Sequence, residues 1–449
     1  MSGAFFERRV LGSTLELFGD LRLQSLDETI SAIRQLTVKS GYSDITINMS
    51  NVTSVTKSVM PPLASYARYL RQEYRIDFDI VESRAPVVKN FIRKHGLLYH
   101  FDPSNSDKPK TNSSDPIILQ FKDHDEREVA VDRIVNAALR TTSLGRQHIA
   151  ALDWAVNEIT DNVLTHSSSK TGGFIISHKL YNSEILEFVV ADCGVGIARS
   201  LSMLDEAEAV ERAIQEGVTR NKTTNQGNGL YGTYRLGLAS AGVFVLKSRH
   251  GNLYVTKEGV VRVRRDQVPF PGTFLVCQID CSQPDLIERA FVFGGRSHTP
   301  AFDYLERKHE QGSDGETNVM ASEICKTFGS RQSGGEARKY LRNLLEATPS
   351  NVLVVDFDGI NVVSSSFADE VFGKLFVELG PMRFMRNVKL KNTVSAVEAL
   401  IDRAITLRAQ SGLCHNCNRD NPAAVTSLNP YPFRSSSTTY FRNAALIAV

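Results

Sequence analysis

Three polar side chains recur at a spacing of four residues in the segment NEITDNVLTHS, residues 157–167. Glu158, Asn162 and His166 bring a carboxylate, an amide and an imidazole, which accept protons or offer oxygen and nitrogen ligands. Because an α-helix turns by about 100° per residue, side chains at this spacing lie in one stripe along a helix. Such a stripe is either the solvated flank of a helix or the wall of a polar pocket.

The surrounding residues favour the pocket wall. An apolar face at spacings of four, three and four is formed by Leu152, Val156, Ile159 and Val163, the pattern of an amphipathic helix. A polar outer face is already supplied by Asp153, Asn157 and Asp161. The stripe that begins at Glu158 lies beside the apolar face, so we expect it to be half-buried at the edge of a core.

Glycine-rich turns follow this predicted helix at three places. The first is ADCGVG, in which Asp192 ends a strand-like run and precedes Gly194 and Gly196. The second opens a helix-like segment, NQGNGLYG, and contains Gly227, Gly229, Leu230, Tyr231 and Gly232. The third is PGTF, with Thr273 before a last strand. Glycine lets a backbone approach a ligand closely, and the start of a helix offers N–H groups to phosphate oxygens.

Taken in order, these segments resemble the N, G1, G2 and G3 boxes of the GHKL ATP-binding superfamily, which includes type II topoisomerases, histidine kinases and anti-sigma kinases. The helical pattern DEREVAVDRIVNAALR before the first box is most similar to the anti-sigma-kinase branch. The resemblance covers residues from about 117 to 280 and implies an α/β sandwich that binds ATP and Mg²⁺.

The resemblance also implies roles for individual residues. Asn162 would coordinate Mg²⁺, and Glu158 would activate a water or hydroxyl nucleophile. Asp192 would accept a hydrogen bond from the adenine amino group, with support from Thr273. Gly194 and Gly196 would border the adenine base. The backbone would reach the phosphates at Gly227, Gly229 and Gly232, and Leu230 and Tyr231 would belong to the same nucleotide-binding segment. Residues 197–226 would form a lid over the nucleotide, with Lys222 as its phosphate contact.

The flanking regions resemble each other. Residues 47–59 and 355–367 both show an apolar strand end, a polar turn and a hydroxyl-rich loop before a helix, which indicates an internal repeat. Both resemble the STAS domain of anti-sigma-factor antagonists, in which a serine at a helix start is phosphorylated. The second copy offers Ser365 and Ser366 as phosphoacceptors, while Lys57 stands at the acceptor position of the first. The alternative is that a serine there serves as a helix N-cap, a commoner role than a regulatory site.

We therefore predict an α/β (α+β) protein with a central GHKL sandwich between two STAS-like domains. The predicted parts are a STAS-like domain at 1–108, the ATP-binding domain at 109–285, a linker at 286–316, a second STAS-like domain at 317–410 and an irregular tail at 411–449. In the tail, Cys414 and Cys417 form a lone C-x-x-C pair, at which we expect no metal.

The composition limits the partners and the location. The chain has 449 residues, and its 52 Lys and Arg nearly balance 50 Asp and Glu, so neither nucleic acid nor a membrane is expected as a partner. The amino terminus lacks an apolar signal segment, and the six cysteines are scattered, a usage typical of the cytoplasm.

Two functions fit these patterns. One is an ATPase or serine/threonine kinase in a partner-switching signalling system, using Mg-ATP and Glu158. The other is a non-catalytic module whose ATP-dependent conformation recruits or releases a regulatory protein. Both imply a protein partner, and the sequence leaves open whether the chain forms a homo-oligomer.

Overall fold

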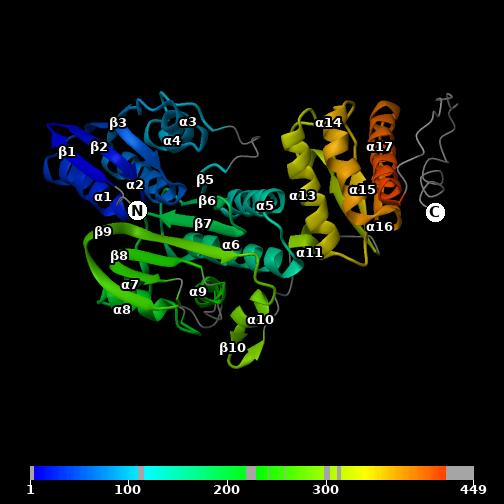
Figure 1. The fold of residues 1–449 in the computed structure, drawn as a ribbon. Helices are drawn as coiled ribbons and strands as arrows, with labels where there is room; N and C mark the ends of the chain where they lie inside the picture. The colour runs from blue at the N-terminus through cyan, green and yellow to red at the C-terminus, as the bar shows by residue number, and fades with distance from the viewer. Residues whose placement is uncertain are drawn as a thin grey trace. The chain divides into compact units, whose positions relative to one another are not determined.

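The structure is a computed structural model that describes residues 5–109, 116–218, 229–240, 242–256, 258–297, 304–310 and 315–420, with side chains up to 410. The chain divides into two compact units (Figure 1). The first comprises Met1–Ala138 and Gln147–Asp303, and the second comprises Leu139–Arg146 and Tyr304–Val449. Each unit combines helices with a sheet, so the predicted α/β (α+β) class is confirmed.

The first unit begins with a four-stranded sheet in the order β1-β2-β3-β4. An antiparallel hairpin, β1–β2, leads into three parallel strands, β2, β3 and β4. The strands are β1 (Phe6–Leu11), β2 (Thr14–Leu21), β3 (Asp44–Val55) and β4 (Asp77–Val81). The helices are α1 (Leu26–Arg34), α2 (Met60–Tyr74), α3 (Pro86–Lys94) and α4 (Leu97–Phe101), with short helical turns at Leu23–Ser25, Gln35–Lys39 and Lys57–Val59.

A five-stranded sheet, in the order β5-β6-β7-β9-β8, follows in the same unit. All its neighbouring strands are antiparallel. The strands are β5 (Leu119–Phe121), β6 (Gly173–Lys179), β7 (Ile185–Asp192), β8 (Phe244–Val255) and β9 (Val261–Asp280). The helices are α5 (His124–Thr141), α6 (Arg146–His166), α7 (Ile197–Ser200), α8 (Glu206–Ala213) and α9 (Gly229–Ala239).

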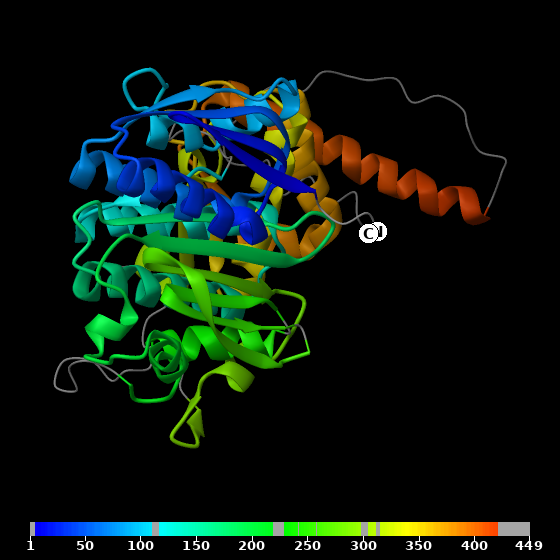
Figure 2. The ribbon, with the colours of Figure 1, turned by 90° about the vertical axis from the view of Figure 1, so that its left-hand side faces the viewer.

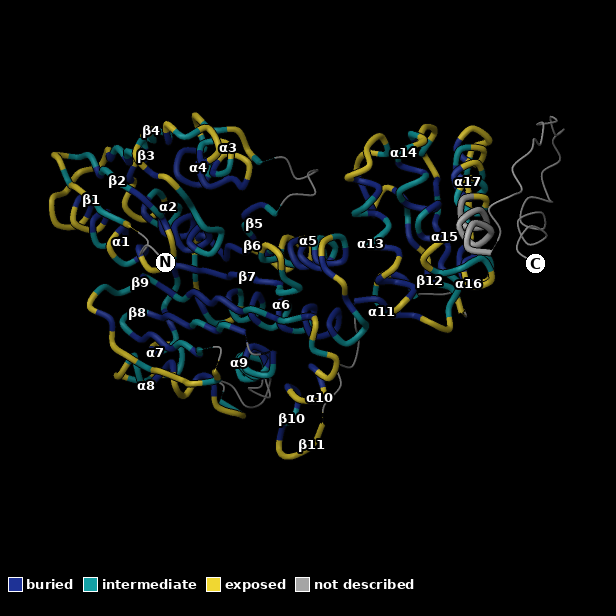
Figure 3. The backbone as a smooth tube through the Cα atoms, viewed as in Figure 1, coloured by how far each residue is buried: buried dark blue, intermediate teal, exposed yellow. Residues whose placement is uncertain are grey.

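Both faces of the five-stranded sheet are covered. Helices α1 and α2 lie between the two sheets of this unit (Figures 1 and 2), where α2 packs on β6 and β7. Val189, Ala191 and Cys193 belong to one buried core together with residues of the four-stranded sheet. Because side chains alternate along a strand, Phe188, Val190 and Asp192 face the other side. Burial on both faces explains the nearly continuous apolar run of β7, which is almost wholly buried (Figure 3).

The second unit contains a three-stranded parallel sheet in the order β12-β13-β14. The strands are β12 (Glu316–Met320), β13 (Val352–Asp356) and β14 (Val388–Lys391). The helices are α11 (Tyr304–Lys308), α12 (Ala321–Ile324), α13 (Arg331–Ala347), α14 (Ser365–Ala368), α15 (Lys374–Leu379), α16 (Pro381–Asn387) and α17 (Ser395–Asp420), with a wide helical turn at Asp369–Gly373.

The two segments of the internal repeat have related surroundings. β3 lies between parallel β2 and β4, and β13 lies between parallel β12 and β14. Each of these middle strands leads through a loop into a helix. The connections differ in length, since a turn at Lys57–Val59 joins β3 to α2 whereas residues 357–364 separate β13 from α14.

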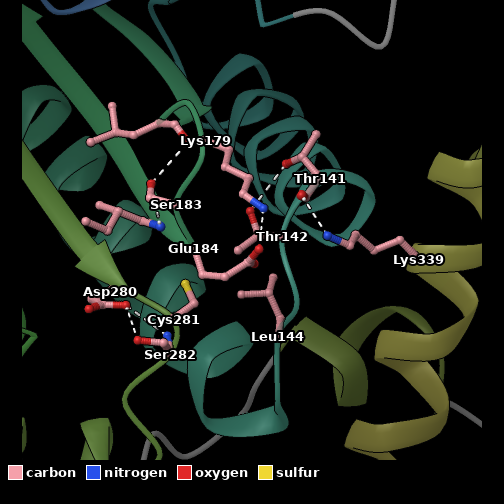
Figure 4. Close-up of polar contacts among 12 residues, drawn as sticks. Thr141, Thr142, Leu144, Lys179, Ser183, Glu184, Asp280, Cys281, Ser282 and Lys339 are labelled. Atoms are coloured by element: carbon pink, nitrogen blue, oxygen red, sulfur yellow. Dashed lines mark hydrogen bonds and ion pairs between the residues drawn. The ribbon is translucent and has the colours of Figure 1, made fainter. Parts of the chain in front are cut away.

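Residues from the end of α5 and the loop that follows it complete the second unit. The side-chain amide of Asn343, on α13, donates to the backbone carbonyls of Leu139 and Thr142, each at 2.8 Å, and its oxygen accepts from Leu144 N at 3.0 Å. Lys339 Nζ donates to Thr141 O at 3.2 Å (Figure 4). Asn343 is 1% exposed, and its side-chain amide pairs with three backbone groups of buried residues, as buried backbone polar groups require.

Two predicted boundaries differ from the structure. The region expected to be a linker, 286–316, contains α10 (Leu286–Ala290), β10 (Val292–Phe293) and β11 (Arg296–Ser297) in the first unit, before α11 and the start of β12 in the second. Helix α17 continues beyond residue 410, where an irregular tail was expected, to Asp420. No proline interrupts this stretch until Pro422, and a helix usually ends before the residue that precedes a proline.

The described part of the chain contains no helix with the length and apolar character needed to cross a membrane. Its cysteines outside α17, Cys193, Cys277, Cys281 and Cys325, are buried free thiols. Cys414 and Cys417 lie on the last turns of α17, beyond the residues whose side chains are described.

Candidate functional site

Helix α6 has the faces that its sequence predicts. The apolar residues are all buried, with exposed fractions of 6% or less: Leu152, Val156, Ile159 and Val163. Glu158, Asn162 and His166 are intermediate in exposure. The stripe is therefore half-buried beside the core, which is the position expected for a pocket wall.

The predicted outer face of α6 is not solvent-exposed, which corrects the interpretation from spacing. Asp153 is 6% exposed, and its carboxylate accepts from Asn157 Nδ2 at 3.0 Å. Asn157 Oδ1 in turn accepts from Arg127 Nη1 of α5 at 3.0 Å. A second helix thus covers this side of α6 through polar contacts, which an apolar pattern does not reveal.

The Glu158 carboxylate lies against the first residue of α9. A Cβ placed on Gly229 would be 2.2 Å from Glu158 Oε2, so any larger residue there would displace the carboxylate. Burial raises the pKa of Glu158 above its ordinary value, the Asp161 carboxylate adds to the increase, and Arg127 opposes it. The helix start and the carboxylate therefore meet in a partly desolvated place.

Asp192, at the end of β7, is a buried carboxylate. It is 4% exposed, and its Oδ1 accepts from Gly194 N at 2.7 Å. Burial raises its pKa to about 7, opposed by the N–H groups of Gly194 and Thr273 and by Arg249. Burial of a carboxylate is unfavourable for its charged form, so a buried carboxylate with a perturbed pKa is a candidate for ligand recognition.

The turn after Asp192 contacts the end of helix α6. Val195 N donates to Ser167 O at 2.7 Å, and a Cβ on Gly194 would lie 2.1 Å from that oxygen. Gly196 is buried in the same turn. The first two predicted boxes therefore touch through backbone atoms.

Thr273 is paired directly opposite Asp192, across β7 and β9. Its Oγ1 lies 3.0 Å from Ser248 Oγ, which also accepts from Ile197 N at 2.8 Å. Sequence reasoning missed Ser248, because a serine within the strand FVLKSRH carries no signal of its own.

The described part of the G2-like segment starts α9. Leu230 and Tyr231 are half-buried, and a Cβ on Gly232 would be 2.3 Å from the indole of Trp154. Trp154 was also missed, although it precedes Glu158 by one helical turn. Gly227 and Lys222 lie outside the described residues.

Part of the predicted lid is a packed structure. Residues 197–218 form α7, α8 and their connections, and Ala209 and Val210 on α8 are fully buried. α8 packs on β8. The apolar pattern inside EAEAVERA accounts for this packing. The rest of the predicted lid, 219–226, lies outside the described residues.

The cation-binding assignment depends on side chains of α6. Among the described residues, no group of three or more His, Cys, Asp or Glu side chains could hold a metal ion. The predicted Mg²⁺ ligand, Asn162, would instead act with phosphate oxygens, as Mg²⁺ sites often do. Its half-buried amide makes no hydrogen bond within the described part of the chain.

Comparison with protein families matches residues 338–398 to a STAS-like domain of unknown function (DUF4325). The match runs from within α13 to the first turn of α17 and includes the serine-bearing start of α14. Comparisons with curated proteins and with solved structures find no match. The region 338–398, inside the domain predicted at 317–410, is therefore STAS-like.

Proposed function

We propose that the first unit is an adenine-nucleotide-binding domain of the GHKL superfamily that binds Mg-ATP and uses it for hydrolysis or phosphoryl transfer in partner-switching signalling. The observation that carries the proposal is the position of α6. This helix meets the turn after Asp192 through Ser167 and meets the start of α9 through Glu158. Segments separated by many residues in the sequence thus lie together around α6, which supports the proposal.

The buried carboxylate supports a preference for adenine. Asp192 faces away from the N-terminal sheet and is fixed by Gly194 N. A carboxylate acceptor pairs with the amino group of adenine, whereas guanine presents a carbonyl oxygen at the same position. We therefore expect ATP to bind in preference to GTP.

The other end of the site suits phosphates and a divalent cation. The N-terminus of α9 offers N–H groups to anions, and Asn162 offers an oxygen ligand one turn beyond Glu158. Bound Mg-ATP would supply the transferable phosphoryl group and the cation that neutralises its charge. The protein's contribution is to hold the nucleotide and to place a base.

Glu158 is the proposed base. The pKa of Glu158 is raised and lies closer to neutral pH than that of an exposed glutamate. A base with such a pKa is better suited to accept a proton from a water or a hydroxyl. The presence of this carboxylate supports an enzyme. A binding-only switch would need Asp192 and the glycines but not Glu158.

The N-terminal domain, which we propose is STAS-like, does not offer its loop for phosphorylation. Ser58 Oγ donates to Glu187 Oε1 at 2.6 Å, and Gln278 Nε2 donates to the other oxygen at 2.7 Å. Glu187 alternates with Phe188 along β7, so it lies on the face opposite Asp192. The Ser58 hydroxyl is thus bound to the five-stranded sheet, and we propose that the phosphoacceptor lies in another part of the chain or in a partner protein.

The first prediction tests nucleotide binding. Titration calorimetry of the full chain should show saturable binding of Mg-ATP and at least about tenfold weaker binding of Mg-GTP, because loss of one hydrogen bond to a charged group costs about 1.5–3 kcal/mol. Equal affinities would contradict the role of Asp192, and no heat with either nucleotide would overturn the proposed function.

The second prediction concerns the serine loop of the STAS-like domain. Ser364 caps α14 by accepting from Phe367 N at 3.0 Å, and its hydroxyl also bonds to Ser366 Oγ at 3.0 Å. Ser365 is exposed. Phosphate at a helix start is stabilised by free N–H groups, so we expect phosphorylation at Ser365 or Ser366 after incubation with Mg-ATP.

Mass spectrometry detects that modification, with Glu158→Ala as the control that should stay unmodified. If the wild type consumes ATP while both serines remain unmodified, the loop is a cap and phosphate goes to water or to another protein.

A further inference from the structure

We propose that Phe291 and Phe293, on the segment that follows the five-stranded sheet, are positioning residues that hold Glu158 against the start of α9. The inference rests on the proposed function, since it assigns these residues to the chemistry of that site. They lie outside the four boxes, in a region that the sequence predicts to be a linker.

Phe291 contacts the helix that carries Glu158. Its ring lies 4.6 Å from that of Trp154, centroid to centroid, at an angle of 63°. Phe291 is 1% exposed. Trp154 precedes Glu158 by one turn of α6, so the contact fixes the helix close to the carboxylate.

Phe293 contacts the other helix. Its ring centroid lies 5.8 Å from that of Tyr231 and 5.9 Å from that of Phe291. A Cβ on Gly232 would meet both Trp154, at 2.3 Å, and Phe293, at 3.2 Å. The aromatic rings therefore fill the junction between α6 and α9, which is where Glu158 meets Gly229.

Polar contacts anchor this segment on both sides. Arg235 of α9 donates to Arg289 O at 3.1 Å and to Tyr231 Oη at 3.0 Å. Gly294 N donates to the Glu216 carboxylate, which follows α8. The segment is thus bound to the elements before and after residues 219–228.

The close fit of Glu158 makes its position sensitive to this junction. Rate losses of about 100-fold can follow from a displacement of 1 Å at a reacting group. Removing the Phe293 ring would leave space between the helices, and the carboxylate would lose its fixed distance from the start of α9. The adenine end, built on β7 and β9, does not depend on this ring.

The test compares Phe293→Ala with Phe78→Ala in the full chain. Phe78 is 4% exposed and packs edge-to-face on Phe101 in the N-terminal domain, so it is a matched loss of a buried ring. We expect Phe293→Ala to lower kcat for Mg-ATP by about 10–100-fold and to change the calorimetric Kd by less than about threefold. Phe293→Leu should restore most of the rate, and Phe78→Ala should keep it.

A second measurement needs no mutation. Trp154 is the single tryptophan of the chain, so its emission should change with Mg-ATP and saturate at the calorimetric Kd. If calorimetry shows binding while Trp154 emission stays constant and Phe293→Ala behaves like Phe78→Ala, the inference is overturned and nucleotide binding stands. If calorimetry shows no binding, the proposed function itself fails. If ATP binds without turnover, Glu158 has no proton transfer to perform, so the inference is overturned while nucleotide binding stands.

Discussion

Glu158→Ala should bind Mg-ATP with wild-type affinity and lose turnover by about 10²–10⁴-fold, the usual effect of removing a general base. The pKa of Glu158 is raised by burial and by Asp161, so the wild-type rate should rise with pH through a value above that of an exposed glutamate. Steady-state ATP hydrolysis between pH 4 and 8, together with calorimetry, measures both effects.

Two neighbouring substitutions provide controls for this experiment. Asp161→Asn removes an adjacent carboxylate of similar exposure and should keep the rate, with the pH profile moved to lower pH because one cause of the raised pKa is gone. Asn162→Ala should weaken the Mg²⁺-dependent part of ATP binding. A catalytic carboxylate is excluded if Glu158→Ala hydrolyses ATP as fast as the wild type.

Asp192→Asn should weaken ATP binding by about 10–100-fold and at the same time stabilise the free protein. The folded state raises the pKa of Asp192 from 3.8 to about 7, so between these values it keeps a proton that the unfolded chain has lost. Wild-type stability therefore falls as pH rises through this window, by up to about 4 kcal/mol at 1.36 kcal/mol per pKa unit. An asparagine does not titrate and avoids that loss.

Urea unfolding at pH 4 and pH 8 compares the two proteins, with Trp154 emission as the probe. The stability advantage of Asp192→Asn should be small at pH 4 and largest at pH 8. Asp153→Asn changes another buried carboxylate of the first unit and should leave ATP affinity unchanged. An Asp192→Asn variant that binds ATP normally would rule out its role in adenine recognition.

The sequence was most informative where one periodicity dominates. In α6, apolar spacing alone predicts both the buried face and the half-buried stripe, because a helix presents each face at a fixed angle. In β7 both faces are buried, so apolar and polar residues do not alternate along the strand. The sequence therefore does not show on which face of the sheet Asp192 lies. The partner on its far face, α2, comes from a part of the chain more than 100 residues away.

The aromatic junction was missed for a related reason. Phe291 follows a helix of five residues, and Phe293 belongs to a strand of two. Such elements are too short for a periodic pattern to be distinguished from a linker. Their partners, Trp154 and Tyr231, lie far away in the sequence. Contacts of this kind depend on the tertiary fold and leave no local signal, whereas glycine-rich boxes are recognisable because close approach restricts the residue type itself.

The Asn343 contacts also have a consequence for biosynthesis. Asn343 and Leu144 are 199 positions apart, so at a synthesis rate of about 5–20 residues per second the loop waits about 10–40 s for its partner to be made. During that interval the backbone groups of Leu139, Thr142 and Leu144 lack the amide that completes them. The second unit cannot finish folding before α13 emerges, and a shortened chain that ends at residue 303 would lack the Asn343 amide altogether.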